Sequence, residues 1–526
     1  MSISDHILRL RTSGKLSQQE FAELFHVSQQ SVQKWESGIS VPDLGKLIRI
    51  AEYFRISLDE LVLDRKPGQT ETQPLQPDFS RRPVWESYTK DMMTEFQQSM
   101  EEGLDLEAYR DVFQAVSVLP ETKEKHDLCD TLFHVVRKAP LRQDYPYREP
   151  SGLEEIRALR SPHPVSGTVP EKNILRGKIR GAWLGRICGC LLGKTVECIR
   201  TEELISFLKE TENYPMHRYI LSTDLTDEIC SHYRFDFRSR KFADGQPYMP
   251  FDDDTNYTVM AQRIIEEYGR NFTSEDVADA WLRWQPKDSY CTAERVAFCN
   301  FIRGYLPPES AVYKNPYREW IGAQIRGDYF GYINPGDPET AAEMAFRDAC
   351  ISHVKNGIYG EMFAAAMIAC AAVTDDMEEI VLGGLAQIPS TSRLYESVMQ
   401  ILNRYHGGAS AEECFDMIHE AYDEHTAHGW CHTIPNAMIV VTSLLYGEKD
   451  YGKSICMAVQ TGFDTDCNGA TVGSVLGMVL GADRLDPVWT DPVHDTLETT
   501  LFGMNMVSVT QRAEMTLSHL EKNPDF

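Results

Sequence analysis

Apolar residues recur at helical spacing along most of this chain. They follow an i, i+3, i+4 pattern in segments 153–160, 275–284, 359–373 and 454–462, and this spacing places them on one face of a helix. Alternation of apolar and polar residues, which is typical of strands, is scarce. The pattern therefore predicts an all-α protein, and a length of 526 residues allows more than one domain.

The same pattern divides the chain into three parts. Residues 1–64 contain short helical segments and are expected to form a five-helix domain. Residues 65–150 begin with a polar, proline-containing stretch, 65–83, and continue with helical segments, which we interpret as a linker and a helical spacer. Residues 151–526 are predicted to form one large helical domain.

The N-terminal part carries the caps and the apolar faces of two consecutive short helices. Ser17 followed three residues later by Glu20 is the pattern of a capping box, and Ser28 can cap the next helix. Val32 and Trp35 are expected to turn inward from that second helix. Its glutamines are then left on the outer face.

These caps and spacings resemble the helix-turn-helix of the phage repressor/Cro-like (XRE) family over residues 6–63. In that family the second of the two helices enters the major groove, where glutamine amides can hydrogen-bond adenine. The resemblance implies double-stranded DNA as a partner and a homodimer, while a polar helix face in a protein–protein module is the alternative. The residues that it assigns to DNA are Gln18, Gln29, Gln30, Gln33 and Lys34.

Charge and composition limit the classes of partner. A formal net charge of −27 disfavours non-specific adhesion to nucleic acid and suits a protein that gathers divalent cations. Residues 1–64 carry seven basic and nine acidic residues, so DNA affinity must come from local placement and dimerisation. The sequence has no membrane-length apolar run, no signal-peptide core and no CxxC pair among its 13 cysteines. We therefore expect a cytoplasmic protein without a membrane partner.

Two clusters of carboxylates precede apolar helices. Asp464 and Asp466 flank one threonine in TGFDTDCNGATVGSVLG, and three consecutive aspartates, 252–254, occur more than two hundred residues earlier. Adjacent carboxylates repel one another unless a cation neutralises them, and oxygen ligands suit Mg²⁺, Mn²⁺ or Ca²⁺. The three aspartates could also cap their helix in solvent. We favour one shared cation site for both clusters.

A glycine-rich segment supplies a third element. Gly181, Gly185, Gly189 and Gly193 recur every four residues, which places them on one helix face and permits close packing against another backbone. Glu197 follows this helix immediately. If the helix ends at the cation site, Glu197 can enter it.

The three elements, in this order, resemble the ADP-ribosylglycohydrolase family over most of residues 150–485. The resemblance implies an all-α fold with a dinuclear magnesium centre in the substrate cleft. It implies Glu197 as the catalytic carboxylate, with the metal-bound Asp254 as the alternative general base. The residues at the family's metal-ligand positions are Asp252, Asp253, Asp254, Asp464, Asp466 and Cys467.

The chain departs from the family pattern at three positions. Asp252 and Cys467 stand where family members have ligand threonines, and Cys190 stands where an aspartate is common. A thiol is a poor ligand for Mg²⁺, whereas the added carboxylate supplies a charged oxygen. These changes could compensate one another, or they could alter the number of metal ions or the substrate.

Further substrate-binding positions follow from weaker patterns. His353 lies in SHVKNG, which resembles a family segment whose histidine is near the substrate; a capped helix start is the alternative. Asn334 and Gly336 lie in a loop rich in glycine, proline and aspartate that could line a phosphate or ribose pocket or could connect two helices. Cys431-His432 and Asn436 precede an apolar helix and are not assigned to the site.

Two functions are consistent with these patterns. The first is a metal-dependent hydrolase of a ribosyl N- or O-glycosidic bond, with an ADP-ribose-like substrate implied by the resemblance, joined to a sequence-specific DNA-binding domain. The second is a transcriptional regulator whose C-terminal domain binds a nucleotide-sugar or nucleoside without turnover. The residues alone support a metal-dependent hydrolase with an acidic site.

Overall fold

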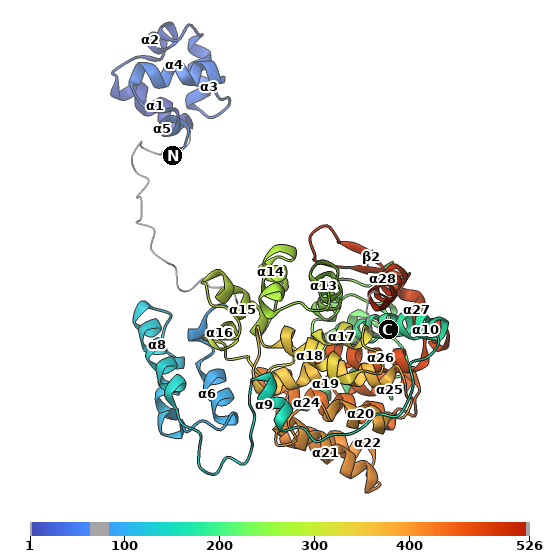
Figure 1. The fold of residues 1–526 in the computed structure, drawn as a ribbon. Coiled ribbons are helices and arrows are strands. Elements are labelled where there is room, and N and C mark those ends of the chain that lie inside the picture. Colours follow the sequence, from blue (N-terminus) through green and yellow to red (C-terminus); the bar gives the residue numbers. More distant parts are fainter. Residues whose placement is uncertain (1–2, 64–83, 522–526) are drawn as a thin grey trace. The chain divides into compact units, whose positions relative to one another are not determined.

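The computed structural model describes residues 3–63 and 84–521, and the predicted linker at 65–83 lies outside this range. The chain divides into two compact units, residues 1–78 and 79–526. Both are helical in their described parts, as Figure 1 shows. The predicted all-α class is confirmed.

The first unit contains the five predicted helices around one small core. They are α1 (Ile3–Ser13), α2 (Gln18–Leu24), α3 (Gln29–Glu36), α4 (Leu44–Phe54) and α5 (Leu58–Leu63). The predicted capping box is present, since the Ser17 side chain accepts from the Glu20 amide and the Glu20 side chain accepts from the Ser17 amide. Ser28 caps α3, and Val32 and Trp35 are buried in the core, as predicted.

The second unit begins with a group of helices and then forms a larger helical body. The first group is α6 (Met92–Glu101), α7 (Arg110–Ser117), α8 (Lys123–Lys138) and α9 (Leu153–Ala158). The remaining elements are α10 (Lys172–Lys194), α11 (Thr201–Glu210), α12 (Asp227–His232), α13 (Asp253–Tyr268), α14 (Ser274–Trp284), α15 (Thr292–Ile302), α16 (Glu309–Val312), α17 (Asp328–Tyr332), α18 (Pro338–Ala349), α19 (Lys355–Ala371), α20 (Met377–Leu385), α21 (Arg393–His406), α22 (Ala411–Ala421), α23 (Ala427–Cys431), α24 (Thr433–Tyr446), α25 (Tyr451–Gln460), α26 (Thr465–Leu480), α27 (Pro487–Thr490), β1 (Thr496–Glu498), β2 (Met506–Ser508) and α28 (Val509–Glu521).

The core of this body forms around helices that are apolar on all sides. Helix α19 is buried along nearly its whole length, and α17, α18, α20, α24 and α26 pack against it (Figure 1). A helix without a polar face must be surrounded by other elements, which accounts for the central position of α19. Strands β1 and β2 pair antiparallel, with Leu497 opposite Val507. In the described ranges no helix has both the length and the apolarity needed to cross a membrane.

Residues 84–149 pack against the larger body through buried charges. Arg318 is buried, and its guanidinium lies 2.9 Å from Glu95 Oε1 and 2.6 Å from Glu102 Oε1, both from α6 or its C-terminal end. Gln98 Nε2 donates to Glu319 Oε2 at 2.6 Å. Removing one partner of a buried ion pair leaves an uncompensated charge, so α6 is bound firmly to this surface.

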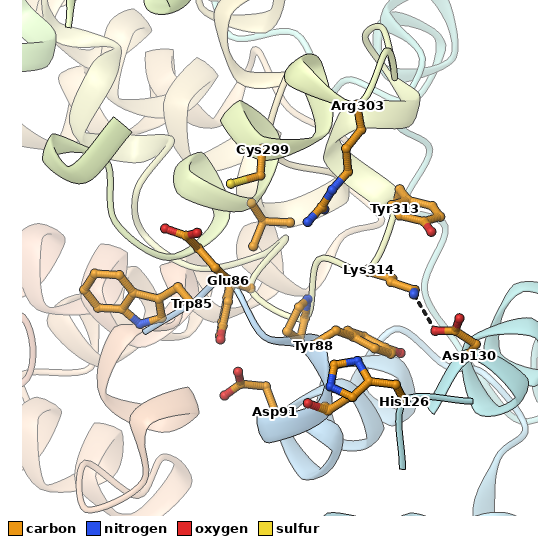
Figure 2. A pocket seen from close by; sticks show the side chains of 14 residues that line it. Trp85, Glu86, Tyr88, Asp91, His126, Asp130, Cys299, Arg303, Tyr313 and Lys314 are labelled. Carbon is orange, nitrogen blue, oxygen red and sulfur yellow. Dashed lines mark hydrogen bonds and ion pairs between the residues drawn. The ribbon is translucent and has the colours of Figure 1, made fainter. Parts of the chain in front are cut away.

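A cavity of about 280 Å³ lies on the same seam (Figure 2). Trp85, Tyr88 and Asp91 line it from one side, and Cys299 and Arg303 line it from α15 and the turn that follows. Its lining shares none of the carboxylates that the sequence assigns to a metal. The chemistry predicted from the sequence therefore lies elsewhere in this unit.

Candidate metal centre and DNA-binding surface

The predicted glycine stripe forms a close antiparallel contact between α10 and α26. A Cβ built at Gly185 would lie 2.1 Å from the carbonyl oxygen of Gly473, and one at Gly189 would lie 2.0 Å from that of Gly469. Glycine at these positions lets the two backbones touch. The predicted close packing against another backbone is confirmed, and the partner is the helix that follows Asp464 and Asp466.

This seam brings the C-terminal end of α10 to the N-terminal end of α26. A Cβ at Gly193 would lie 2.2 Å from the carbonyl oxygen of Thr465, whose hydroxyl donates to the Gly193 carbonyl at 2.9 Å. The N-terminal end of α13 joins them, since the Cys467 thiol donates to Asp254 Oδ2 at 3.2 Å and Lys194 Nζ lies 2.5 Å from Asp252 Oδ2. The structure thus brings the three predicted elements together.

Asp252 is the N-cap of α13. Its Oδ1 accepts from the Asp254 amide at 3.1 Å, and its Oδ2 accepts from Lys194. Burial favours the neutral acid, but the Lys194 ammonium outweighs this effect and lowers the pKa of Asp252. Asp252 is therefore held as a carboxylate by groups of the protein itself.

Asp254 contacts a buried arginine. Arg186 donates to Asp254 Oδ1 at 3.2 Å and to Asp328 Oδ2 at 2.8 Å, and all three side chains are fully buried. Burial and the neighbouring carboxylates Asp252 and Asp253 raise the pKa of Asp254 although Arg186 opposes them. Asp253 is partly exposed, and its pKa is raised by burial and then by Asp252 and Glu197.

Asp464 and Asp466 lie at the start of α26 and are both buried. The amide of Asp464 donates to Asn436 Oδ1 at 3.2 Å, and the thiol of Cys431 donates to Asp464 Oδ2 at 3.5 Å. Asp466 Oδ1 is buried without a hydrogen-bond partner among the described residues. Burial raises the pKa of both carboxyl groups, and for Asp466 the charges of Glu197 and Asp252 add to it.

Glu197 lies just beyond the end of α10 and is partly exposed. Burial, followed by the charges of Asp252 and Asp464, raises the pKa of Glu197 to about 7. Arg240 Nη1 lies 3.6 Å from Glu197 Oε2 and opposes this shift. A carboxylate with a pKa near neutrality suits general acid–base chemistry.

A divalent cation fits this arrangement. The donor atoms of Asp464, Asp466 and Cys467 lie within 4.8 Å of one another, and so do those of Cys190, Asp252 and Asp254. Carboxylate oxygens are the ligands that Mg²⁺ and Mn²⁺ prefer. A buried carboxylate oxygen without a hydrogen-bond donor is costly, and a bound cation would satisfy Asp466 Oδ1.

The three weaker substrate-binding candidates make contacts inside the fold. His353 is fully buried, its Nδ1 lies 2.8 Å from the Ser352 hydroxyl, and burial holds its pKa well below the usual value. Asn334 Nδ2 donates to the Phe330 carbonyl, while its Oδ1 accepts from Arg270. Gly336 has φ +77°, and its amide donates to the carbonyl of Ala369 in α19. These contacts fit the alternative in which Asn334 and Gly336 connect two helices, α17 and α18, while His353 precedes α19, whose N-cap Val354 has no side-chain cap.

Several residues that contact the acidic cluster or its arginine were not predicted from the sequence. They are Arg186, Lys194, Asp328, Cys431 and Asn436. The sequence itself pointed to Arg186 and Lys194, because charged residues inside an apolar, glycine-rich helix must find buried partners. The others lie on elements whose approach to Asp464 or Arg186 depends on the tertiary fold.

A second cluster, Glu101, His428 and His432, lies where α6 meets α23 and α24. His428 Nε2 lies 2.9 Å from Glu101 Oε2, and His428 Nδ1 accepts from Trp320 Nε1 at 3.1 Å. His432 Nδ1 accepts from the Ile434 amide at 3.2 Å. A neutral imidazole whose Nδ1 accepts carries its proton on Nε2, and in His428 this nitrogen donates to Glu101. His432 Nε2 is buried without a hydrogen-bond partner among the described residues and lies 3.8 Å from Glu101 Oε2.

The predicted DNA-binding residues lie on the surface of the first unit. Gln18 is partly buried, and its Nε2 donates to Glu36 Oε2 at 2.7 Å. Arg11 Nε lies 2.5 Å from the other oxygen of Glu36, so one carboxylate ties α1, α2 and α3 together. The residues of α3 that were expected to face DNA are all exposed: Gln29, Gln30, Gln33 and Lys34.

Comparison with known proteins agrees with this two-part organisation. The sequence model of the ADP-ribosylglycohydrolase family matches residues 171–516, and a helix-turn-helix model matches residues 7–61. The HTH-type transcriptional activator BcrR of Enterococcus faecalis is 36% identical over 62 residues, which are 12% of this chain and 30% of that protein. The chain thus spans less than a third of that relative's length.

One solved structure is also similar to part of this chain at low sequence identity. It is described as an ADP-ribosylglycohydrolase-related protein complex, and it matches 66% of this chain and 99% of its own with 16% identity and a TM-score of 0.43. The family match covers more than half of the chain and includes every carboxylate of the acidic cluster. The protein therefore belongs to the ADP-ribosylglycohydrolase family and carries an N-terminal helix-turn-helix domain.

Proposed function

We propose that the protein is a metal-dependent hydrolase of a ribosyl N- or O-glycosidic bond, joined to a sequence-specific DNA-binding domain. Its substrate is an ADP-ribosyl compound. Asp464 and Asp466 are the cation ligands, Asp253 contributes from the other cluster, and Glu197 is the catalytic carboxylate. The observation that carries the proposal is Asp466 Oδ1, which is buried and has no hydrogen-bond partner among the residues that the structure describes. It lies in the same acidic cluster as Glu197, whose pKa is about 7.

Hydrolysis requires one proton to be moved at this site. Glu197 accepts a proton from the attacking water as its oxygen bonds to the anomeric carbon, the glycosidic bond breaks, and the leaving group takes up the proton. A bound Mg²⁺ or Mn²⁺ would orient the ribose hydroxyls and the water. The carboxylates around the site stabilise the positive charge that develops on the sugar ring.

In this proposal a cavity of about 810 Å³ takes the nucleotide part of the substrate, although none of the carboxylates of the acidic cluster lines it. Phe96, Tyr145 and Tyr422 provide aromatic walls, and Arg142 adds a positive charge. His432 lines this cavity and directly follows Cys431, whose thiol contacts Asp464. A base could stack on the rings while the ribose approaches the carboxylates.

This arrangement also supports a domain assignment. Residues 1–64 form the DNA-binding domain, residues 65–150 contain the linker and the helical segments, and residues 151–526 form the glycohydrolase domain. Residues 84–149 contribute the aromatic residues Phe96 and Tyr145 to the cavity, which gives them a role in substrate binding beyond that of a spacer.

The first unit binds double-stranded DNA through α3 in this proposal. The exposed glutamines of α3 read bases in the major groove, and Gln18 lies near a phosphate. A homodimer would place two α3 helices on two half-sites, which would supply affinity that an acidic chain otherwise lacks.

The second candidate function is ligand sensing without turnover. The observation in its favour is the set of hydrogen-bond donors that already contact the Asp252 and Asp254 oxygens, which leaves fewer lone pairs to bind a metal ion.

The deciding experiment measures release of ADP-ribose from ADP-ribosyl substrates with Mg²⁺, by the wild type and by Asp464→Asn. Metal-dependent release that Asp464→Asn abolishes supports the hydrolase. Calorimetric binding of ADP-ribose without release supports the sensor.

A further inference from the structure

The two halves of the acidic cluster differ in how far their oxygen atoms are already occupied. Asp252 Oδ1 accepts from the Asp254 amide at 3.1 Å, and Asp252 Oδ2 accepts from Lys194 at 2.5 Å. Asp254 Oδ1 accepts from Arg186 at 3.2 Å, and Asp254 Oδ2 accepts from the Cys467 thiol at 3.2 Å. Each oxygen of Asp252 therefore has a nitrogen donor from the protein, and Asp254 has the Arg186 guanidinium on one oxygen and a weakly donating thiol on the other.

The Asp464–Asp466 half is open by comparison. Asp466 Oδ1 is buried and has no hydrogen-bond partner in the part of the chain that the structure describes. Asp464 Oδ2 accepts from the Cys431 thiol at 3.5 Å, and a thiol is a weak donor. This half keeps oxygen lone pairs for a cation.

Lys194 is positioned to act as a fixed cation. It is the last residue of α10, and the packing of Gly193 against Thr465 fixes the position of the Lys194 backbone. Its ammonium contacts the nearly fully buried Asp252 and lies 5.8 Å from the centre of the Phe251 ring. A divalent ion on the same carboxylate oxygen would be repelled by this ammonium across a short distance in a buried site.

We infer that this chain holds one divalent cation, at Asp464 and Asp466, and that the Lys194 ammonium takes the place of a second. The inference rests on the proposed metal-dependent function and departs from the two ions that the family resemblance implies. Asp252 and Lys194 then act as a pair, in which the carboxylate that replaces a family threonine is neutralised by the Lys194 ammonium. The occupied Asp254 oxygens are consistent with the same single-ion centre.

The test counts bound ions on the full chain. Chelator-stripped protein is dialysed against Mn²⁺, bound manganese per chain is measured by mass spectrometry, and the electron paramagnetic resonance spectrum is recorded. We expect one ion per chain and the spectrum of an isolated Mn²⁺. Lys194→Met frees Asp252, so we expect two ions and the exchange-coupled spectrum of ions about 3.5–4 Å apart. Lys194→Arg keeps the charge and should still bind one.

Asp464→Asn gives the background of ions bound elsewhere, and circular dichroism shows whether each variant is folded. Two ions in the wild type would overturn the inference and leave the proposed hydrolase standing. One ion in a folded Lys194→Met would also overturn it, because Lys194 would then not be what excludes the second ion. No manganese above background in any variant would refute the metal-dependent function as well. If Lys194→Met does not fold, Lys194→Gln, which also removes the charge, takes its place, and the wild-type count still tests whether one ion is bound.

Discussion

The seam between α10 and α26 is the feature on which assembly of the metal centre depends, and Gly189→Ala tests it. A Cβ at position 189 would lie 2.0 Å from the carbonyl oxygen of Gly469, whereas ordinary van der Waals contact begins at 3.4 Å. The difference, 3.4 − 2.0, means that the helices must separate by about 1.4 Å at this level. The atom in the way belongs to a backbone, so no side chain can rotate to make room.

The magnitude follows from two opposing effects. Overpacking a well-packed core costs about 1–3 kcal/mol, and a backbone obstacle places this site at the upper end. The better helix propensity of alanine over glycine offsets about 1 kcal/mol. We therefore expect the second unit to lose about 2 kcal/mol of unfolding free energy.

The assay is chemical denaturation followed by tryptophan fluorescence, to which Trp183 in the middle of α10 contributes as one of eight tryptophans. Gly177→Ala is the matched control, because position 177 lies on the same helix and a Cβ there has no heavy atom within 4 Å. That variant should gain up to about 1 kcal/mol. If Gly189→Ala were as stable as Gly177→Ala, the two backbones would not be in contact, and the account of how Lys194 and Glu197 reach the aspartates would fail.

Three further predictions concern the chemistry, the DNA surface and the packing of residues 84–149. Glu197→Gln should slow hydrolysis by about 10²–10⁴-fold and abolish the rise of the rate with pH, because the ionised glutamate is the base. In the wild type the midpoint of that rise should lie at or below pH 7, since a bound cation would offset the carboxylate charges that raise the pKa of Glu197. Gln29→Ala and Gln30→Ala should each weaken binding to DNA selected from a random library by about 1–3 kcal/mol in a mobility-shift assay. Arg318→Met should cost the second unit about 3–5 kcal/mol in chemical denaturation, since it takes the cation from buried Glu95 and leaves buried Glu102 with Lys355.

The DNA-surface and arginine predictions each have a control on the same chain. Gln19→Ala changes an exposed glutamine of α2 that hydrogen-bonds Glu23, and it should leave DNA binding unchanged. Arg110→Met breaks an exposed pair with Glu107 and should cost about 0–1 kcal/mol. Equal effects of the two arginine variants, or an unchanged pH profile for Glu197→Gln, would contradict the corresponding interpretation.

Local spacing was enough to predict much of this structure. The Ser17 capping box, the cap at Ser28 and the inward Trp35 depend on residues within a few positions of one another, and all three are confirmed. The glycine stripe on α10 depends on a four-residue period and correctly predicted contact with another backbone. Such features are decided by one helix and its caps, which a sequence pattern describes directly.

The parts that were not predicted depend on where side chains from different elements meet. Asp252 resembles a metal ligand in sequence, but the approach of Lys194 gives its oxygen a cation from the protein. Cys431 and Asn436 reach Asp464 because α24 packs against α26, and no local pattern encodes that approach. Charge compensation in a buried site is a property of the assembled core, so it becomes visible once the helices are placed.

The direction of the three helices explains why this centre can exist before a cation arrives. Asp252 and Asp464 are N-cap residues of α13 and α26, where the partial positive charge of a helix dipole favours carboxylates. Lys194 ends α10, where the partial negative charge favours an ammonium. Each charge is thus stabilised by its own helix, and the glycine seam holds opposite charges from α10 and its partners in contact. The chain therefore needs the cation to complete the Asp466 side of the centre, while its own lysine completes the Asp252 side.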